Sequence, residues 1–301
     1  MGKQQRRRPK PLQRTALHGL RLLLLAFAAS AAAHDQPAED AWWWDARWWY
    51  EGVLAVPQNH TVIVEEHSIV HGDVDIPAVV VRPADRAPYP GVLFVHGRRG
   101  LDDLVLLHVR RLAARGFVVF APDLYSGRFI EKYPIEHDYV LEEDLDRVLD
   151  YMLAELKGIR GRRVCVYSHT RGGYYSLKLA VTKGRQERDI ACYASYYPHL
   201  QDPNAPEPMQ VYRYAPEVDA LRIPALIFIG EQEQYQRRRP IEMAVAELRK
   251  QRRPVRLVVY PGVGRGFDFR PEGVRTFADD LAAKDAIQRA AEFLRRNLAD
   301  E

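Results

Sequence analysis

Short apolar runs and longer amphipathic stretches alternate along most of the chain. The apolar runs have the length and composition of buried strands and cover residues 91–95, 117–120, 164–167, 190–197, 225–229 and 255–260. Apolar positions at helical spacing follow between them, over residues 104–114, 140–156, 241–250 and 277–298. Residues 61–66 and 76–81 form an earlier hairpin pattern, and the Pro-rich residues 198–224 interrupt the alternation as an insertion. The pattern predicts an α/β fold, with a mostly parallel sheet that carries helices on both faces.

The most informative stretch is RVCVYSHTRGGYYSLKL, residues 163–179, where a strand pattern passes into a helix pattern with almost no loop. So sharp a turn needs small residues on both sides of the residue at its tip. Ser168 lies on one side and the pair Gly172 and Gly173 on the other, so the tip falls on Thr170. The other choice, Ser168 at the tip, leaves the glycine pair unused. We therefore predict a nucleophile elbow with neither serine nor cysteine at its tip.

The N-terminus has the pattern of a targeting segment. Seven basic residues precede the apolar run 22–33, which ends in small residues suited to cleavage after Ala33. We expect residues 1–33 to be a signal peptide and the protein to be exported, periplasmic or secreted; an uncleaved anchor is the alternative, although twelve apolar residues are too few to span a bilayer. Cleavage would change the formal net charge from +4 to −3, because seven positive charges leave with no negative one. We therefore expect no nucleic-acid partner.

All five tryptophans fall within residues 34–60, which we interpret as a Trp-rich N-terminal arm. They are Trp42, Trp43, Trp44, Trp48 and Trp49. One interpretation is that the arm packs on the following domain, because large aromatic side chains bury well. The other is that it docks on a protein partner or a membrane interface.

Cys165 and Cys192 are the two cysteines of the chain, and both lie in apolar strand-like runs. An exported protein meets an oxidising compartment, so a disulfide between them is arithmetically possible. Their apolar surroundings favour two buried free thiols instead.

Five stretches in this order resemble the dienelactone hydrolase family of the α/β-hydrolase superfamily. They are GVLFVHGRRG (91–100), LAARGFVVFAPDLY (112–125), the elbow, IPALIFIGE (223–231) and YPGVGRGF (260–267). The resemblance covers residues 61–298 and implies one α/β-hydrolase domain over residues 61–301. It also implies a hydrolase of esters or lactones that needs neither a metal nor another cofactor.

The family is similar in using a Cys or Ser nucleophile, an Asp and a His, which by position fall on Thr170, Glu233 and Arg265. All three positions are substituted. A threonine hydroxyl needs a neighbouring base, and a guanidinium cannot serve because it stays protonated. Glu233 and Arg265 are matched as a forked ion pair instead, unless Glu233 faces water and Arg265 caps a loop. The family's cysteine enzymes also tend to have a Glu at the place of Gly97.

The oxyanion hole implied by the resemblance uses backbone N–H groups, here those of Arg98 and Arg171, which survive side-chain replacement. With Arg99 and His199 as further ligand-binding candidates, the site fits a small carboxylate, ester or other anion. We expect such binding without conventional hydrolysis. The alternatives are an active hydrolase in which a base such as His96, His169 or His199 serves Thr170, and a partner-docking scaffold that works through its Trp-rich arm.

Overall fold

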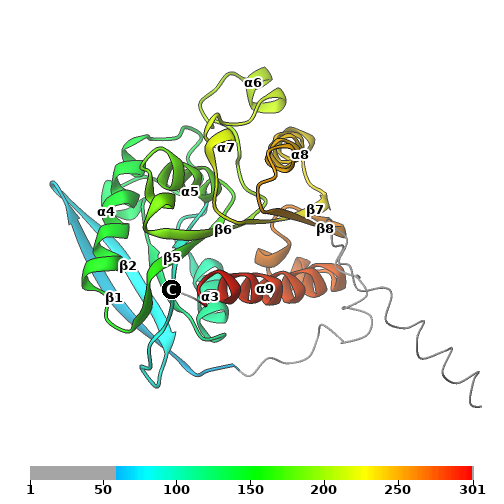
Figure 1. Ribbon diagram of the computed structural model, residues 1–301. Coiled ribbons are helices and arrows are strands. Elements are labelled where there is room, and N and C mark those ends of the chain that lie inside the picture. The colour runs from blue at the N-terminus through cyan, green and yellow to red at the C-terminus, as the bar shows by residue number, and fades with distance from the viewer. Residues whose placement is uncertain (1–58, 300–301) are drawn as a thin grey trace, which may run out of the picture. The chain divides into compact units, whose positions relative to one another are not determined.

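The computed structural model describes residues 59–299, in which eight strands form one sheet (Figure 1). Its strand order is β1-β2-β4-β3-β5-β6-β7-β8; β1 to β2 and β2 to β4 are antiparallel, and all other neighbours are parallel. The strands are β1 (Val62–His71), β2 (Val74–Pro83), β3 (Tyr89–Val95), β4 (Val118–Pro122), β5 (Ile159–His169), β6 (Ile190–Tyr196), β7 (Ala225–Gln232) and β8 (Val255–Gly264). The predicted α/β-hydrolase architecture, a mostly parallel sheet with helices on both faces, is confirmed.

The helices lie on both faces of this sheet: α3 and α9 cover one face, and α4, α5 and α8 cover the other (Figure 1). The helices are α3 (Asp103–Ala113), α4 (Val140–Glu155), α5 (Gly172–Val181), α6 (Glu207–Tyr212), α7 (Glu217–Ala220), α8 (Tyr235–Lys250) and α9 (Phe277–Asn297), with short 3-10 turns η1 (Ser126–Arg128), η2 (Arg185–Glu187), η3 (Phe267–Phe269) and η4 (Glu272–Val274). Because both faces are covered, the central strands are continuously apolar rather than alternating. Residues 92–95 of β3 and 164–167 of β5 are completely buried.

The first two strands form the predicted hairpin, in register from Val62 opposite Pro83 to His71 opposite Val74. Gly72 makes the turn possible, since its backbone has φ +61° with open space around the missing side chain. The Pro-rich insertion contains the short helices α6 and α7. Helix α8 begins six residues before the predicted helix at 241, because its first turns are polar and carry no apolar periodicity.

Cys165 and Cys192 form a disulfide, so the interpretation as two buried free thiols is wrong. The two residues are direct partners in the parallel register of β5 and β6, and their Cα atoms are 4.7 Å apart. That separation lies inside the range that a disulfide can bridge. Neighbouring strand positions that face the same side thus bring together two side chains that are 27 residues apart in the chain.

The proposed signal peptide and nearly all of the Trp-rich arm, including its five tryptophans, lie outside the described residues. Among residues 59–299, no helix combines the length and the apolar character needed to cross a membrane.

Candidate functional site

The turn between β5 and α5 has the geometry of a nucleophile elbow with Thr170 at its tip. Thr170 has φ +50°, a left-handed backbone that β-branched residues rarely adopt. Its main-chain N–H donates to the carbonyl of Tyr196 at 3.1 Å, which fixes the tip to the neighbouring strand. A Cβ atom at Gly172 would lie 2.3 Å from the carbonyl oxygen of Val95, and one at Gly173 would lie 2.4 Å from Pro198. Both glycines are therefore required for the close approach of the helix to the adjacent strands.

The hydroxyl of Thr170 is not presented to solvent. Its Oγ1 atom is buried and has no hydrogen-bond partner within the described part of the chain. A Cβ atom built on Gly97 would lie only 1.8 Å from this oxygen, so the hydroxyl packs directly against the main chain of the loop after β3. The same contact leaves no room for a glutamate at position 97. The Thr170 hydroxyl would have to move out of this contact before it could attack a substrate.

The charges of four guanidinium groups act on the buried imidazole of His199, next to the elbow tip. The main-chain N–H of His199 donates to the carbonyl of Thr170 at 2.8 Å. Burial lowers the pKa of His199 well below its ordinary value, and four positive charges lower it further: those of Arg265, Arg237, Arg171 and Arg98. The imidazole is therefore neutral at physiological pH, and its Nδ1 atom has no partner among the described residues. We call Arg98, Arg171, Arg237 and Arg265 the arginine cluster.

The arginine cluster is held mainly by neutral oxygen atoms. Arg98 donates from Nε to the carbonyl of Pro134 at 2.7 Å and from Nη2 to that of Tyr133 at 2.6 Å. Arg171 donates to the carbonyls of Glu136 at 2.6 Å and Ile135 at 2.7 Å. These bonds orient the guanidinium groups without neutralising their charges.

Arg237 shows the electrostatic effect of this arrangement. Burial and then the charges of Arg265, Arg171 and Arg98 lower the pKa of Arg237 to about 10, and Glu233 offsets only part of that change. The side chain of Arg237 donates to the amide oxygen of Gln210 at 3.3 Å, which is again a neutral partner.

Glu233 and Arg265 form an ion pair, with Nη1 of Arg265 3.0 Å from Oε2 of Glu233. The carboxylate is completely buried. The pair is a single close contact rather than the expected fork, and neither atom has the geometry of a hydrogen bond. Arg265 also lies over the ring of Tyr197, with its Cζ atom 5.0 Å from the ring centroid.

The remaining candidate residues fall into different surroundings. The main-chain N–H groups of Arg98 and Arg171 make no hydrogen bond within residues 59–299, which leaves both donors for a ligand. Arg99 contacts Asp102 at 2.5 Å instead, at the start of α3. His96 is a structural residue, because Nδ1 donates to the carbonyl of Gly97 and Nε2 accepts from the N–H of Leu124.

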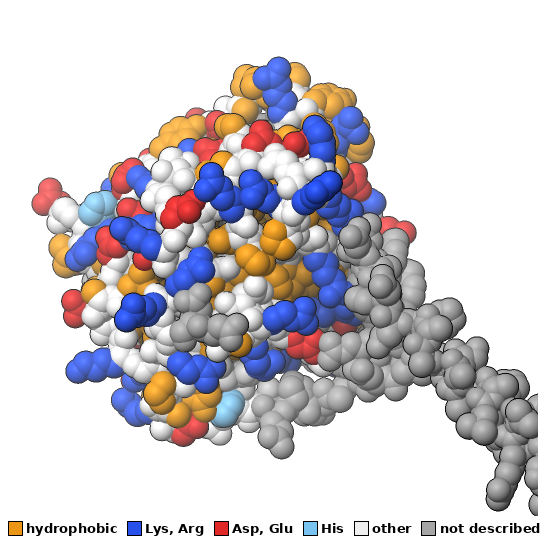
Figure 2. Space-filling view, in the orientation of Figure 1, with side chains coloured by type: hydrophobic (Ala, Val, Ile, Leu, Met, Phe, Trp, Pro, Cys, Tyr) orange, Lys and Arg blue, Asp and Glu red, His pale blue; other side chains and the backbone are white. Residues whose placement is uncertain are grey.

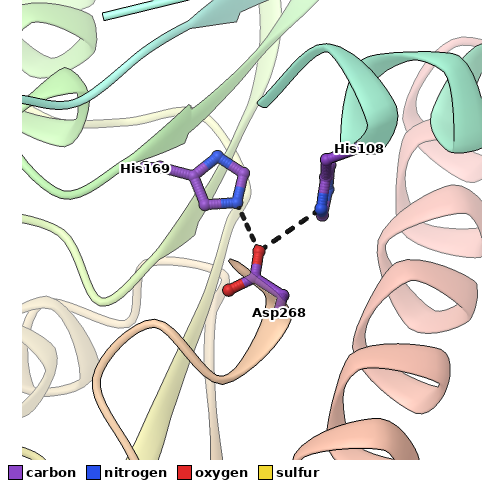
Figure 3. A group of neighbouring side chains, drawn as sticks. All are labelled: His108, His169 and Asp268. Atoms are coloured by element: carbon purple, nitrogen blue, oxygen red, sulfur yellow. Dashed lines mark hydrogen bonds and ion pairs between the residues drawn. The ribbon is translucent and has the colours of Figure 1, made fainter. Parts of the chain in front are cut away.

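A second buried group, not found from the sequence, lies behind the elbow and consists of His108, His169 and Asp268 (Figure 3). His169 Nε2 is 2.7 Å and His108 Nδ1 is 3.3 Å from the same carboxylate oxygen, Oδ2. The hydroxyl of Tyr197 donates to the other oxygen of Asp268 at 2.5 Å. Burial alone would raise the pKa of Asp268, but the two histidines and Tyr197 outweigh it and lower the pKa.

These three residues tie together α3, the end of β5 and the loop after β8. His169 points toward Asp268 and is thereby engaged away from the hydroxyl of Thr170. Their donor atoms lie within 4.8 Å of one another, so among the described residues they are the group that could ligate a metal ion. The same atoms already satisfy one another, and we assign the group a tethering role. Tyr197 connects it to the arginine cluster through its ring and hydroxyl.

Comparison with known proteins shows which family this sequence matches. The sequence pattern of the dienelactone hydrolase family matches residues 76–298. A Salmonella typhimurium protein provisionally named carboxymethylenebutenolidase is 26% identical over 238 residues, which cover 73% of this chain and 82% of that protein. A chlorophyllase type 0 of Chenopodium album is 27% identical over 124 residues, 38% of this chain, and the match spans about a third (35%) of the chlorophyllase.

A solved structure shares the fold. Brefeldin A esterase, a bacterial homologue of human hormone-sensitive lipase, superposes with a TM-score of 0.63 at 17% sequence identity. The match covers 97% of this chain and 89% of the esterase. At this identity the likeness concerns the fold alone.

Proposed function

The chain belongs to the dienelactone hydrolase family, and from this premise we propose that it binds a small organic anion at the elbow without conventional ester hydrolysis. The proposal joins two features of the same site. The arginine cluster supplies positive charge beside the elbow tip, and the residues at the family's triad positions are unsuited to proton transfer.

The observation that carries the proposal is the imbalance of charge around His199. The positive charges of four guanidinium groups act on this neutral imidazole. The carboxylate in contact with the arginine cluster is that of Glu233, which pairs with Arg265. Like charges held close together repel one another, and this repulsion is part of what lowers the pKa of Arg237 to about 10. A bound carboxylate would offset the repulsion and accept charge-assisted hydrogen bonds. The free N–H groups of Arg98 and Arg171 would add two main-chain donors beside the elbow tip.

The same geometry argues against the usual acyl-transfer mechanism. A general base must lie within hydrogen-bond reach of the nucleophile and must be able to lose its proton. Arg265 fails the second condition at any physiological pH, and its charge is directed to Glu233. The buried Thr170 hydroxyl, which packs on Gly97 and lacks a partner in the described residues, fails the first.

Ester hydrolysis through a relocated base is the alternative function, and one observation favours it. His199 is neutral, as a general base must be, and its main chain is bonded to that of Thr170. Its Nδ1 atom has no hydrogen-bond partner among residues 59–299 and could accept from the Thr170 hydroxyl. The Thr170 side chain would first have to rotate out of its present position. No carboxylate is bonded to His199 within those residues to orient the ring.

Anion binding is tested by a matched pair of ligands, benzoate and its neutral isostere benzamide, added to the purified protein at constant ionic strength. Benzoate should raise the melting temperature with concentration, because a ligand that binds only the folded state stabilises it. Benzamide should have a much smaller effect. Equal stabilisation by the two compounds, or by neither, would contradict the proposal.

A substitution in the arginine cluster tests whether benzoate binds at this site. Arg237→Gln should weaken benzoate binding by about tenfold or more, the usual size of a lost charged hydrogen bond. Arg188→Gln removes the same charge from an exposed position, where the side chain is 70% accessible and pairs with its neighbour Asp189. That variant should bind benzoate like the parent protein.

We also propose that the protein is exported, on the basis of the basic and apolar pattern of residues 1–33. N-terminal sequencing of the protein from its own cell envelope would test this, with a mature end near position 34 expected. The Trp-rich arm offers a separate proposal of partner docking. Deletion of residues 41–51 should then abolish partner capture while benzoate binding is kept.

A further inference from the structure

The segment between η1 and α4 carries large apolar side chains in solvent. Phe129 is 95% and Ile135 is 84% exposed, and Tyr133 and Tyr139 are about half exposed. Single exposed apolar side chains are normal on protein surfaces, whereas grouped ones are typical of contact surfaces, and here four fall within eleven residues. We call Phe129, Tyr133, Ile135 and Tyr139 the apolar rim.

The apolar rim belongs to the segment that holds the arginine cluster in place. The main-chain carbonyl of Tyr133 accepts from Arg98, and that of Ile135 accepts from Arg171. In return, the N–H of Tyr133 donates to the carbonyl of Arg98 at 2.6 Å. The main chain that carries the exposed side chains of Tyr133 and Ile135 is thus bonded directly to the guanidinium groups of Arg98 and Arg171.

Two of the rim residues hold their side chains at a conformational cost. Phe129 has φ +56° and Tyr133 has φ +64°, a backbone region in which bulky residues are outliers. Glycine or asparagine would adopt these angles more readily. Aromatic rings are found there nevertheless, although one of them contacts almost nothing in the chain. Strain of this kind is concentrated at ligand sites.

A second apolar surface borders the arginine cluster from the insertion. Helix α6 exposes Met209 and Tyr212, and the first residue of α8, Tyr235, is also exposed. The side chain of Arg237 bonds to Gln210 of the same short helix. Figure 2 shows hydrophobic and basic side chains together at the top of the molecule, over α6. Exposed apolar side chains are therefore found on both segments that bond the arginine cluster, residues 129–139 and helix α6.

We propose that the ligand is an amphiphilic anion, a carboxylate on a hydrocarbon chain, whose charged end binds the arginine cluster and whose chain lies on the apolar rim. This inference rests on the proposed anion binding and names the class of anion. The charge of the cluster alone would accept any small anion, and the apolar surface alone would accept any oily compound. Because the segment that carries the rim also bonds two guanidinium groups of the cluster, one ligand that uses both features is the best fit.

The inference is tested by calorimetric titration of the full chain with acetate, octanoate and octanol, below the concentrations at which they aggregate. Each methylene group that leaves water strengthens binding by about fourfold. Burial of three methylene groups on the rim should therefore make octanoate bind roughly 60-fold more tightly than acetate. Octanol, which lacks the charge, should bind more weakly than octanoate by at least tenfold.

Exposed positions allow variants that should not disturb folding. The double variant Phe129→Ser with Ile135→Ser should lose most of the preference for octanoate and keep acetate binding unchanged. Val70→Ser, at an exposed position near the tip of the β1–β2 hairpin, is the control and should behave like the parent. Loss of octanoate preference in the double variant but not in the control supports the proposal.

Each other outcome overturns a different part of the argument. Equal binding of acetate and octanoate would refute the amphiphile while leaving anion binding intact. Failure of both anions would refute the proposed function itself. Octanol bound as tightly as octanoate would show an apolar surface independent of the arginines. Sedimentation with phosphatidylglycerol vesicles, without binding of monomeric octanoate, would assign the rim to a membrane surface and refute the single-chain ligand.

Discussion

Replacement of Glu233 by glutamine removes the carboxylate that contacts the arginine cluster. In the parent protein this carboxylate is fully buried and lies 3.0 Å from Arg265, whose side chain is 19% exposed. The variant would leave Arg265 largely buried and next to other positive charges, with an amide in place of its counter-ion. Breaking a buried ion pair from one side costs about 3 to 5 kcal/mol, and partial exposure of Arg265 places the expected loss at about 3 kcal/mol.

Thermal unfolding monitored by circular dichroism measures this loss. For a domain of this size, about 3 kcal/mol corresponds to a melting temperature lower by roughly 6 to 12 °C. The pair Glu187 and Arg222 supplies the control, since its atoms are a similar 3.2 Å apart while both side chains are 61% exposed. Glu187→Gln should leave the melting temperature nearly unchanged.

The second variant Arg265→Met separates loss of the pair from loss of the carboxylate. When it is combined with Glu233→Gln, no uncompensated charge remains at this position, so the double variant should be more stable than Glu233→Gln alone. Glu233→Gln should also bind benzoate more tightly, because a competing negative charge has been removed. A single variant within about 0.5 kcal/mol of the parent, with unchanged benzoate affinity, would refute the reasoning.

Three further predictions follow from other parts of the structure. Gly97→Ala places a methyl group 1.8 Å from Oγ1 of Thr170 and should destabilise the fold by about 2 kcal/mol in urea denaturation. Adding Thr170→Gly to the same chain should restore part of the lost stability. If it restores none, the clash lies elsewhere. Replacing Cys165 and Cys192 by alanine opens a loop of 27 residues and should lower the free energy of unfolding by about 3.5 kcal/mol, whereas an unchanged value would argue against the disulfide. Burial lowers the pKa of His108 from 6.5 to about 3. Between these two pH values the unfolded chain therefore binds a proton at His108 that the folded protein does not bind. Stability should therefore fall from pH 6.5 toward pH 3, by up to about 1.4 kcal/mol per pH unit, and His108→Asn should flatten this dependence in denaturation curves.

The sequence predicted those parts of the site that depend on local pattern. The glycine pair Gly172 and Gly173 marks the elbow because a sharp strand-to-helix turn tolerates no side chain there. The order of the family stretches then places Glu233 and Arg265 near Thr170, and the ion pair between them is present. Each of these predictions uses residues close to a recognisable strand end.

The missed residues depend on contacts that no local pattern reveals. Arg237 lies in the polar first turns of α8, before the apolar spacing begins. The helix pattern therefore did not show toward which side of the helix its side chain points. Asp268 bonds His169 across 99 positions of the chain, and their pairing is set by how the loop after β8 folds back. The disulfide was missed because the register of two parallel strands is fixed by the helix between them rather than by the strand sequences.

Turnover of an aryl ester, p-nitrophenyl acetate, by the purified protein tests most directly whether this site binds without hydrolysing. The parent protein and Thr170→Ala should both release nitrophenol at the rate of the buffer alone, because Arg265 cannot accept a proton and the hydroxyl is packed against Gly97. Equal release above that rate would point to a contaminant or to another site. Rapid release by the parent that disappears in Thr170→Ala would contradict the account and show that the elbow is catalytic.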